Sequence, residues 1–223
     1  MRHVSAEDFS TLVGSIYDCA LDPALWPETL GALCERMMFL SATLAVVEMP
    51  TGKGLINAAH GIDPPWLAAL GQYGKEIMDQ WERVRDYPLD VPMILSDVNP
   101  HALTLANRYH REVCAPRGVV DSLSIGLLRD STTFGAATFT RHESVGLVGP
   151  AEVELARLFI PHLKRSVTIS RLLEAHSLRS GTYARVLDGL SVAVLLVGSD
   201  LRLLHANRAD PAAYRRPARP ARR

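Results

Sequence analysis

The stretch at residues 120–128 constrains the fold more than any other part of this 223-residue chain, because its side chains alternate between two kinds. Read as an extended strand, it has one apolar face and one face of small residues. The two faces are Leu123, Ile125 and Leu127 against Ser122, Ser124 and Gly126. Residues 134–140 return across a turn at residues 129–132, which predicts an antiparallel hairpin. The face of small residues leaves room for a covering helix or a bound molecule.

Helices and strands are predicted ahead of this hairpin. One helix begins at Ser5, with Asp8 three residues later as a loose capping box, and a second follows the pair Asp22-Pro23. A third begins at Asp63. The other expected elements are strands at 42–48 and 54–59, a mainly looped stretch at 86–101 with a short strand at 93–95, and a short helix at 102–114.

A long helix is predicted after the hairpin, over residues 150–186. Pro161 must kink or restart it, since proline removes a helical hydrogen bond. Two short strands, 192–198 and 201–206, follow, and an arginine- and proline-rich tail that we expect to be disordered ends the chain. The predicted organisation is a sensory domain at 1–148, a connecting helix at 149–188, a β-hairpin at 189–210 and the tail at 211–223.

The pattern as a whole predicts an α+β fold, in which helices flank an antiparallel sheet. Five arginines and no acid lie in residues 211–223, so residues 1–210 carry a net charge of −5. A negative body repels phosphate, which argues against nucleic-acid binding by the main domain. Three widely spaced cysteines and the lack of an apolar run of about 18 residues favour a cytoplasmic protein with no membrane segment.

Four segments, in order, resemble one family, the proteobacterial LuxR-type transcription regulators. They are residues 16–30 (IYDCALDPALWPETL), 107–124 (NRYHREVCAPRGVVDSLS), 155–173 (LARLFIPHLKRSVTISRLL) and 187–210 (LDGLSVAVLLVGSDLRLLHANRAD). The last is similar to the start of a PAS-like segment, with Asn207 at its usual asparagine position. The resemblance covers roughly residues 9–210, and four ordered segments are more specific than one motif.

The resemblance implies a GAF-like sensory fold, a long connecting helix and an incomplete PAS-like start. It also implies a C-terminal helix-turn-helix domain, for which the sequence after residue 210 has no helical pattern. We therefore expect a regulator truncated before that domain, so that promoter DNA is a partner only of intact homologues. The expected partners of this chain are a second copy of itself and an unknown small molecule.

Aromatic side chains with polar tips are the candidates for a ligand site, because such pockets combine apolar walls with a few directed hydrogen bonds. The candidates are Trp66, Tyr73, Trp81 and Tyr87, facing Ser122 and Ser124 across the predicted pocket. Their helical spacing by itself predicts core packing, and that interpretation is favoured over a pocket. The eight histidines show no ligand spacing, so no metal and no cofactor is expected.

A dimer interface is predicted along the long helix. Its candidate residues are Leu155, Leu158, His162, Ile169 and Leu172. Two alternatives stay open beside the sensory module. One is a small-molecule-processing enzyme on a GAF-like fold, although no nucleophile and base are paired in the sequence. The other is a dominant-negative dimerisation partner of an intact regulator.

Overall fold

The computed structural model of the chain describes residues 5–49, 51, 53–188, 194–197 and 202–208. The chain divides into two units, residues 1–170 and 171–223. The tail predicted at 211–223 lies outside the described residues. Each unit is described by itself below, beginning with the larger one.

Both helices predicted at the N-terminus are confirmed. Helix α1 spans Ala6–Leu21, and the Ser5 hydroxyl caps it by accepting a hydrogen bond from the Asp8 backbone N–H at 3.0 Å. Asp22 accepts in the same way from the Ala24 N–H, which starts a single 3₁₀ turn, η1 (Pro23–Leu25), before helix α2 at Trp26–Met37. The caps therefore act where the sequence places them.

A five-stranded antiparallel sheet forms the centre of the larger unit, with strand order β2-β1-β5-β4-β3. The expected strands and the expected hairpin are all present. Their bounds are β1 Ser41–Glu48, β2 Lys53–His60, β3 Met93–Ile94, β4 Val119–Arg129 and β5 Thr133–His142.

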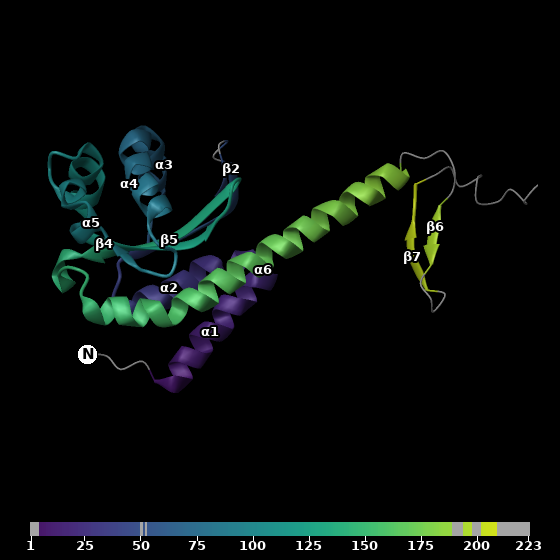
Figure 1. Cartoon of the computed structure of the whole chain (residues 1–223), viewed down its shortest axis with the longest axis horizontal. Helices are drawn as coiled ribbons and strands as arrows, with labels where there is room; N and C mark the ends of the chain where they lie inside the picture. Colours follow the sequence, from purple (N-terminus) through teal and green to yellow (C-terminus); the bar gives the residue numbers. More distant parts are fainter. Residues whose placement is uncertain (1–4, 50, 52, 189–193, 198–201, 209–223) are drawn as a thin grey trace, which may run out of the picture. The chain divides into compact units, whose positions relative to one another are not determined.

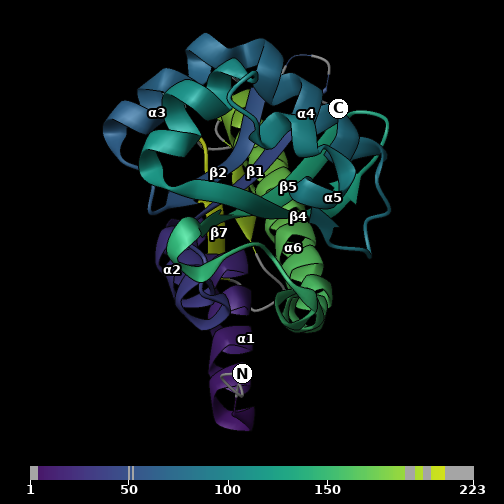
Figure 2. The same ribbon diagram turned by 90° about the vertical axis from the view of Figure 1, so that its left-hand side faces the viewer.

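Helices cover both faces of this sheet (Figure 1). One face carries α1, α2 and the first part of α6 (Pro150–Asp188), and their apolar side chains, among them Trp26 and Phe159, form the main core with Phe139 of β5. The opposite face carries α3 (Pro64–Leu70), α4 (Gly74–Asp86) and α5 (Leu95–Val98), as the rotated view also shows (Figure 2). The predicted α+β fold is confirmed.

Two predicted helices differ in the structure. The helix that begins at Asp63 starts as expected, since its carboxylate accepts from the Trp66 N–H at 2.7 Å, but a 3₁₀ turn, η2 (Gly71–Tyr73), separates α3 from α4. Glycines at both ends of that turn weaken a continuous helix.

The predicted helix at 102–114 is also not one element. It is a 3₁₀ turn, η3 (Pro100–Leu103), and a later π-helical turn, η4 (His110–Cys114), which a 3₁₀ turn, η5 (Ala115–Arg117), follows. The Asn107 side chain accepts from the His110 N–H at 2.9 Å and so caps the second turn separately.

Helix α6 continues through Pro161 as one element, so the helix does not restart there. Figure 1 shows that it changes direction within its first half. The division between the units falls inside this helix, after Ser170. The reason is that its first five turns bury apolar side chains in the main core: Ala156, Phe159, Ile160, Leu163 and Val167.

The smaller unit contains the predicted hairpin, formed by strands β6 (Leu195–Val197) and β7 (Leu203–Ala206). Asn207 is buried beside it and joins two segments. Its side-chain amide donates to the Leu187 carbonyl at 2.7 Å and its oxygen accepts from the Val194 N–H at 2.8 Å. A PAS-like identity for this hairpin stays a prediction.

No helix in the described part of the chain has both the length and the apolar character needed to cross a membrane.

Candidate ligand-binding site

A cavity of about 650 Å³ lies between the sheet and the layer of α3, α4 and α5. Its position agrees with the pocket expected between the third helix and the face of small residues. The size falls in the range of small-molecule sites, roughly 300–1,000 Å³. The side chains that line it come from all five strands of the sheet, the covering helices and η3 and η4, so residues far apart in the sequence meet here.

The floor of the cavity is built from small side chains in cross-strand rows. In one row Thr140 pairs with Ser41 on one side and Ser122 on the other, and in the next row Thr138 lies between Thr43 and Ser124. The Ser41 and Thr140 hydroxyls are 2.6 Å apart, and those of Ser124 and Thr138 are 3.0 Å apart. In the third row Ala136 lies between Ala45 and Gly126. The floor thus changes from hydroxyl groups to apolar groups along the strands.

The walls follow the same gradient. Near the hydroxyl rows, Trp66 of α3 packs with Cys114 and Val119, and its indole N–H donates to the Tyr109 hydroxyl at 3.0 Å. At the other end, Val84 of α4 and Met93 of β3 pack against Ala136. One end of the cavity is therefore polar and the other is apolar.

Titratable groups at the polar end are held in neutral forms by burial. Burial is the main cause that raises the pKa of the Tyr109 phenol, and it raises the pKa of the Cys114 thiol to about 11. Burial also lowers the pKa of the His110 imidazole below its usual value. All three groups are uncharged near pH 7, because a buried site disfavours the ionised form.

Asp121 lines the cavity, but both oxygens of its carboxylate already accept hydrogen bonds from other groups of the protein. Its fully buried carboxylate accepts four hydrogen bonds. One oxygen accepts from the backbone N–H groups of Ser96 (3.0 Å) and Ser122 (2.8 Å), and the other from the Ser96 hydroxyl (2.8 Å) and the Val148 N–H (3.1 Å). The carboxylate therefore joins α5, a wall of the cavity, to the turn that precedes α6.

Three of the six predicted ligand-binding residues line the cavity: Trp66, Ser122 and Ser124. Tyr73 is buried behind this wall, where its hydroxyl donates to the Glu112 carboxylate at 2.8 Å and its ring lies 5.5 Å from that of Tyr109. Tyr87 is half-buried against the cluster of Val84 and Met93. The side chain of Trp81 lies outside the described residues.

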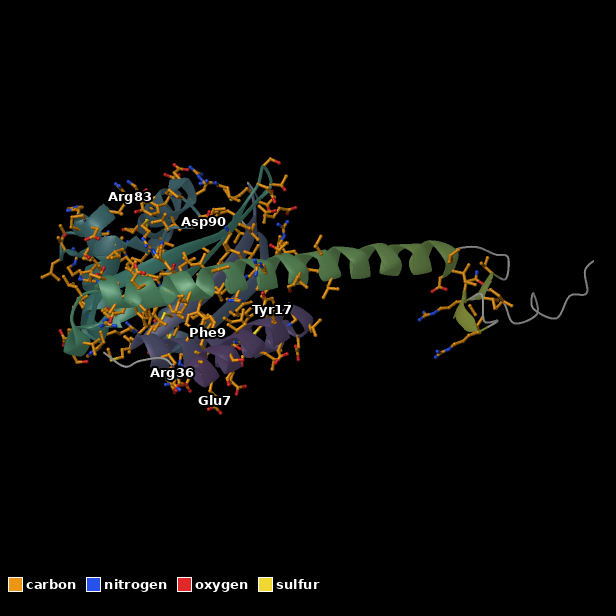
Figure 3. All side chains as sticks on the ribbon, turned by 60° about the horizontal axis from the view of Figure 1, so that its bottom comes forward. Glu7, Phe9, Tyr17, Arg36, Arg83 and Asp90 are labelled. Carbon is orange, nitrogen blue, oxygen red and sulfur yellow. The ribbon has the colours of Figure 1, made fainter. Side chains whose placement is uncertain are left out.

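The predicted dimer residues divide into two groups. Leu158, Ile169 and Leu172 expose large apolar side chains, whereas Leu155 packs partly against the main core. His162 contacts α1 of the same chain, with its ring 5.8 Å from that of Phe9 and 5.7 Å from that of Tyr17. Figure 3 labels Phe9 and Tyr17 on α1 beside α6. Dimerisation stays a prediction.

The fold also brings to the cavity several residues that the sequence patterns do not single out: Ser41, Thr43, Thr138, Thr140, Tyr109 and His110. The alternation of Ala136, Thr138 and Thr140 in the returning strand was a signal for the floor. No local signal marks His110, because its position depends on the irregular turn that Asn107 caps. Among the described residues, no three histidine, cysteine or acidic side chains gather as a metal site.

No protein-family model matches the sequence, and no curated protein matches it. Solved structures do match the fold. An N-acylhomoserine lactone dependent LuxR family transcription factor, CepR2 from Burkholderia cenocepacia, superposes with a TM-score of 0.53 at 15% identity, over 74% of this chain and 94% of that one. The LBD domain of VqsR from Pseudomonas aeruginosa gives 0.54 at 13% identity, over 72% and 94%.

A GAF domain is also similar, that of a phosphoenolpyruvate-protein phosphotransferase from Coxiella burnetii. Its TM-score is 0.50 at 16% identity, over 77% of this chain and 99% of that one. At such identities the comparisons bear on the fold. The chain has an α+β fold of the kind shared by GAF domains and LuxR-type ligand-binding domains.

Proposed function

We propose that this chain is the sensory module of a LuxR-type transcription regulator and that it binds an uncharged small molecule in the cavity on the sheet. The cavity itself carries the proposal, since about 650 Å³ of space remains between the sheet and the helices that cover it. Natural interiors are close-packed, so a space of this size beneath a helical layer favours a ligand.

The lining supports an uncharged ligand. No lysine or arginine is among the described residues that line the cavity, so a carboxylate or phosphate would be buried without a counter-charge. Burying an unpaired charge is costly. A cationic ligand has no free anionic partner either, because the Asp121 carboxylate already accepts four hydrogen bonds from the protein.

The gradient along the cavity supports an amphipathic ligand. Its polar group would lie near Trp66, Tyr109 and the hydroxyl rows, and its apolar part would lie against Val84, Met93 and Ala136. CepR2 is described as N-acylhomoserine lactone dependent, and such a molecule is uncharged and amphipathic. The structural likeness to CepR2 and to the VqsR domain supports a sensory role in transcription regulation.

Binding is favoured over catalysis by the state of the possible nucleophiles. The Cys114 thiol, with a pKa of about 11, is protonated near pH 7, and the thiolate is the reactive form. The hydroxyls of Ser41 and Ser124 pair with threonine hydroxyls, which cannot act as general bases.

The proposal is tested by native mass spectrometry of the purified chain, followed by mild denaturation to release a co-purifying molecule. We expect an uncharged molecule of a few hundred daltons at up to one per chain. Ala136→Phe places a ring in the apolar end and should abolish its retention, whereas Ser131→Phe, at an exposed turn, should leave it unchanged. Equal retention by the two variants would refute a ligand in this cavity.

A further inference from the structure

We infer that His110 anchors the ligand, through a hydrogen bond between its imidazole nitrogen Nδ1 and the polar group of the uncharged molecule. This inference rests on the proposed function and adds a specificity-determining residue to the same cavity. His110 is not among the residues that sequence patterns single out.

The first argument is an unpaired, covered nitrogen, Nδ1, in a side chain that lines the cavity. Among the described residues, two buried side-chain nitrogens have no hydrogen-bond partner, Nε1 of Trp26 and Nδ1 of His110. Trp26 lies in the main core on the other face of the sheet, whereas His110 lines the cavity. A buried nitrogen without a partner lowers stability, so a ligand group that reaches Nδ1 restores a missing interaction.

The second argument is that the backbone that carries the imidazole is held in place. His110 is 7% exposed and begins the π-helical turn η4, and its N–H is fixed by the Asn107 side chain at 2.9 Å. Its neighbour Tyr109 is fixed by the hydrogen bond from Trp66. Single π-helical turns recur at functional sites. Nδ1 itself is covered, and a half-turn of the ring, which exchanges Nδ1 with a ring carbon, turns it to the opposite side, where the ligand would accept or donate the hydrogen bond.

The third argument is the charge state of the surroundings. The other ionisable side chains lining the cavity are Asp121, Tyr109 and Cys114. Asp121 is saturated by protein donors, and burial keeps Tyr109 and Cys114 protonated. Burial also favours the neutral imidazole of His110. A neutral imidazole pairs with an uncharged hydroxyl, amide or carbonyl group rather than with an ion.

The test measures how much a single hydroxyl group contributes to binding. The probe is the neutral fluorescent dye prodan, which we expect to bind in the cavity, and two competitors of matched shape, 4-butylphenol and butylbenzene, are titrated against it. The preference for the phenol over the hydrocarbon is compared in the wild-type chain, His110→Leu and His110→Asn. His101→Leu, which removes an exposed histidine of η3, is the matched control.

We expect the preference to fall about five- to tenfold in His110→Leu, the effect of losing one hydrogen bond. His110→Asn keeps a polar atom near the position of Nδ1 and should retain most of the preference. This variant keeps the test decisive even if His110→Leu fails to fold. His101→Leu should behave as wild type. If His110→Leu binds prodan normally and keeps the full preference for the phenol, the role of His110 as an anchor is refuted, while the proposed function is not affected. Prodan that does not bind the wild type, or that Ala136→Phe fails to exclude, would overturn the proposed function as well.

Discussion

The indole Nε1 of Trp66 donates a hydrogen bond to the Tyr109 hydroxyl over 3.0 Å, and this bond joins helix α3 to the turn that carries His110. The two residues are 43 positions apart in the sequence. The guanidinium of Arg117 lies 5.1 Å from the centre of the Trp66 ring and so supports it from outside the cavity lining. The polar wall of the cavity is therefore held by contacts between elements rather than within one element.

The Trp66–Tyr109 bond is expected to contribute about 1 kcal/mol to the free energy of unfolding. A double-mutant cycle of Trp66→Phe, Tyr109→Phe and the combined variant measures this coupling by urea unfolding. If the two single effects simply add, the hydrogen bond makes no contribution of its own.

Asp121→Asn should lower the free energy of unfolding by about 3 kcal/mol, since an amide replaces one of two accepting oxygens with a donor that faces an N–H group. Asp97→Asn is the control, because Asp97 is an exposed carboxylate of the neighbouring α5. Urea unfolding of both variants checks the prediction. A loss no larger than that of the control would show that the four hydrogen bonds are dispensable.

Arg141, near the end of β5, is expected to be one of the positions at which substitution lowers stability most. Its buried guanidinium pairs with Glu152 at 3.1 Å and donates to the carbonyl groups of Met37 and Met38. Arg141→Met should cost about 3–5 kcal/mol, because it leaves the largely buried Glu152 carboxylate without its counter-charge. The exposed pair of Arg157 and Glu154 offers the comparison, and Arg157→Met should change stability by less than about 0.5 kcal/mol. Similar losses on thermal unfolding would contradict the role given to burial.

Burial of His110 makes stability depend on pH in a defined direction. The pKa of the folded-state imidazole is lowered, so the unfolded chain binds a proton more readily near the usual value of about 6.5. The contribution of His110 is therefore fully present above that pH and is lost as the pH falls toward the lowered pKa. Urea unfolding at pH 5.5 and pH 7.5 should show a smaller difference for His110→Asn than for the wild-type chain. An equal difference would exclude His110 as the source.

Self-association through the exposed apolar side chains of α6 is the remaining prediction. Leu158, Ile169 and Leu172 recur on one side of the helix and would be buried against a second copy. Leu172→Lys should weaken a dimer at least tenfold, as measured by light scattering over a concentration series. Glu174→Gln is the control: it lies at an exposed position two residues away and also raises the net charge by one unit, but it should leave the dimer affinity unchanged. A wild-type chain that stays monomeric at high micromolar concentration would refute the interface.

The local elements of this protein could be predicted because each rests on interactions between near neighbours. Ser5 and Asp22 cap their helices through N–H groups two or three residues ahead, and the sequence contains both partners. The hairpin of β4 and β5 follows equally from a two-residue alternation on each side of a short turn. Such patterns fixed the α+β class and the face of small residues on which the cavity lies.

The composition of the site was decided only by the tertiary structure. Trp66 lines the cavity and Tyr73 does not, although both follow the same helical spacing, because the 3₁₀ turn Gly71–Tyr73 interrupts the helical repeat between α3 and α4. His110 enters the cavity through a capped irregular turn, and its partners in the wall come from other elements. Spacing specifies which side chains share a face, whereas the close packing of separate elements decides which of those faces meet and what space remains between them.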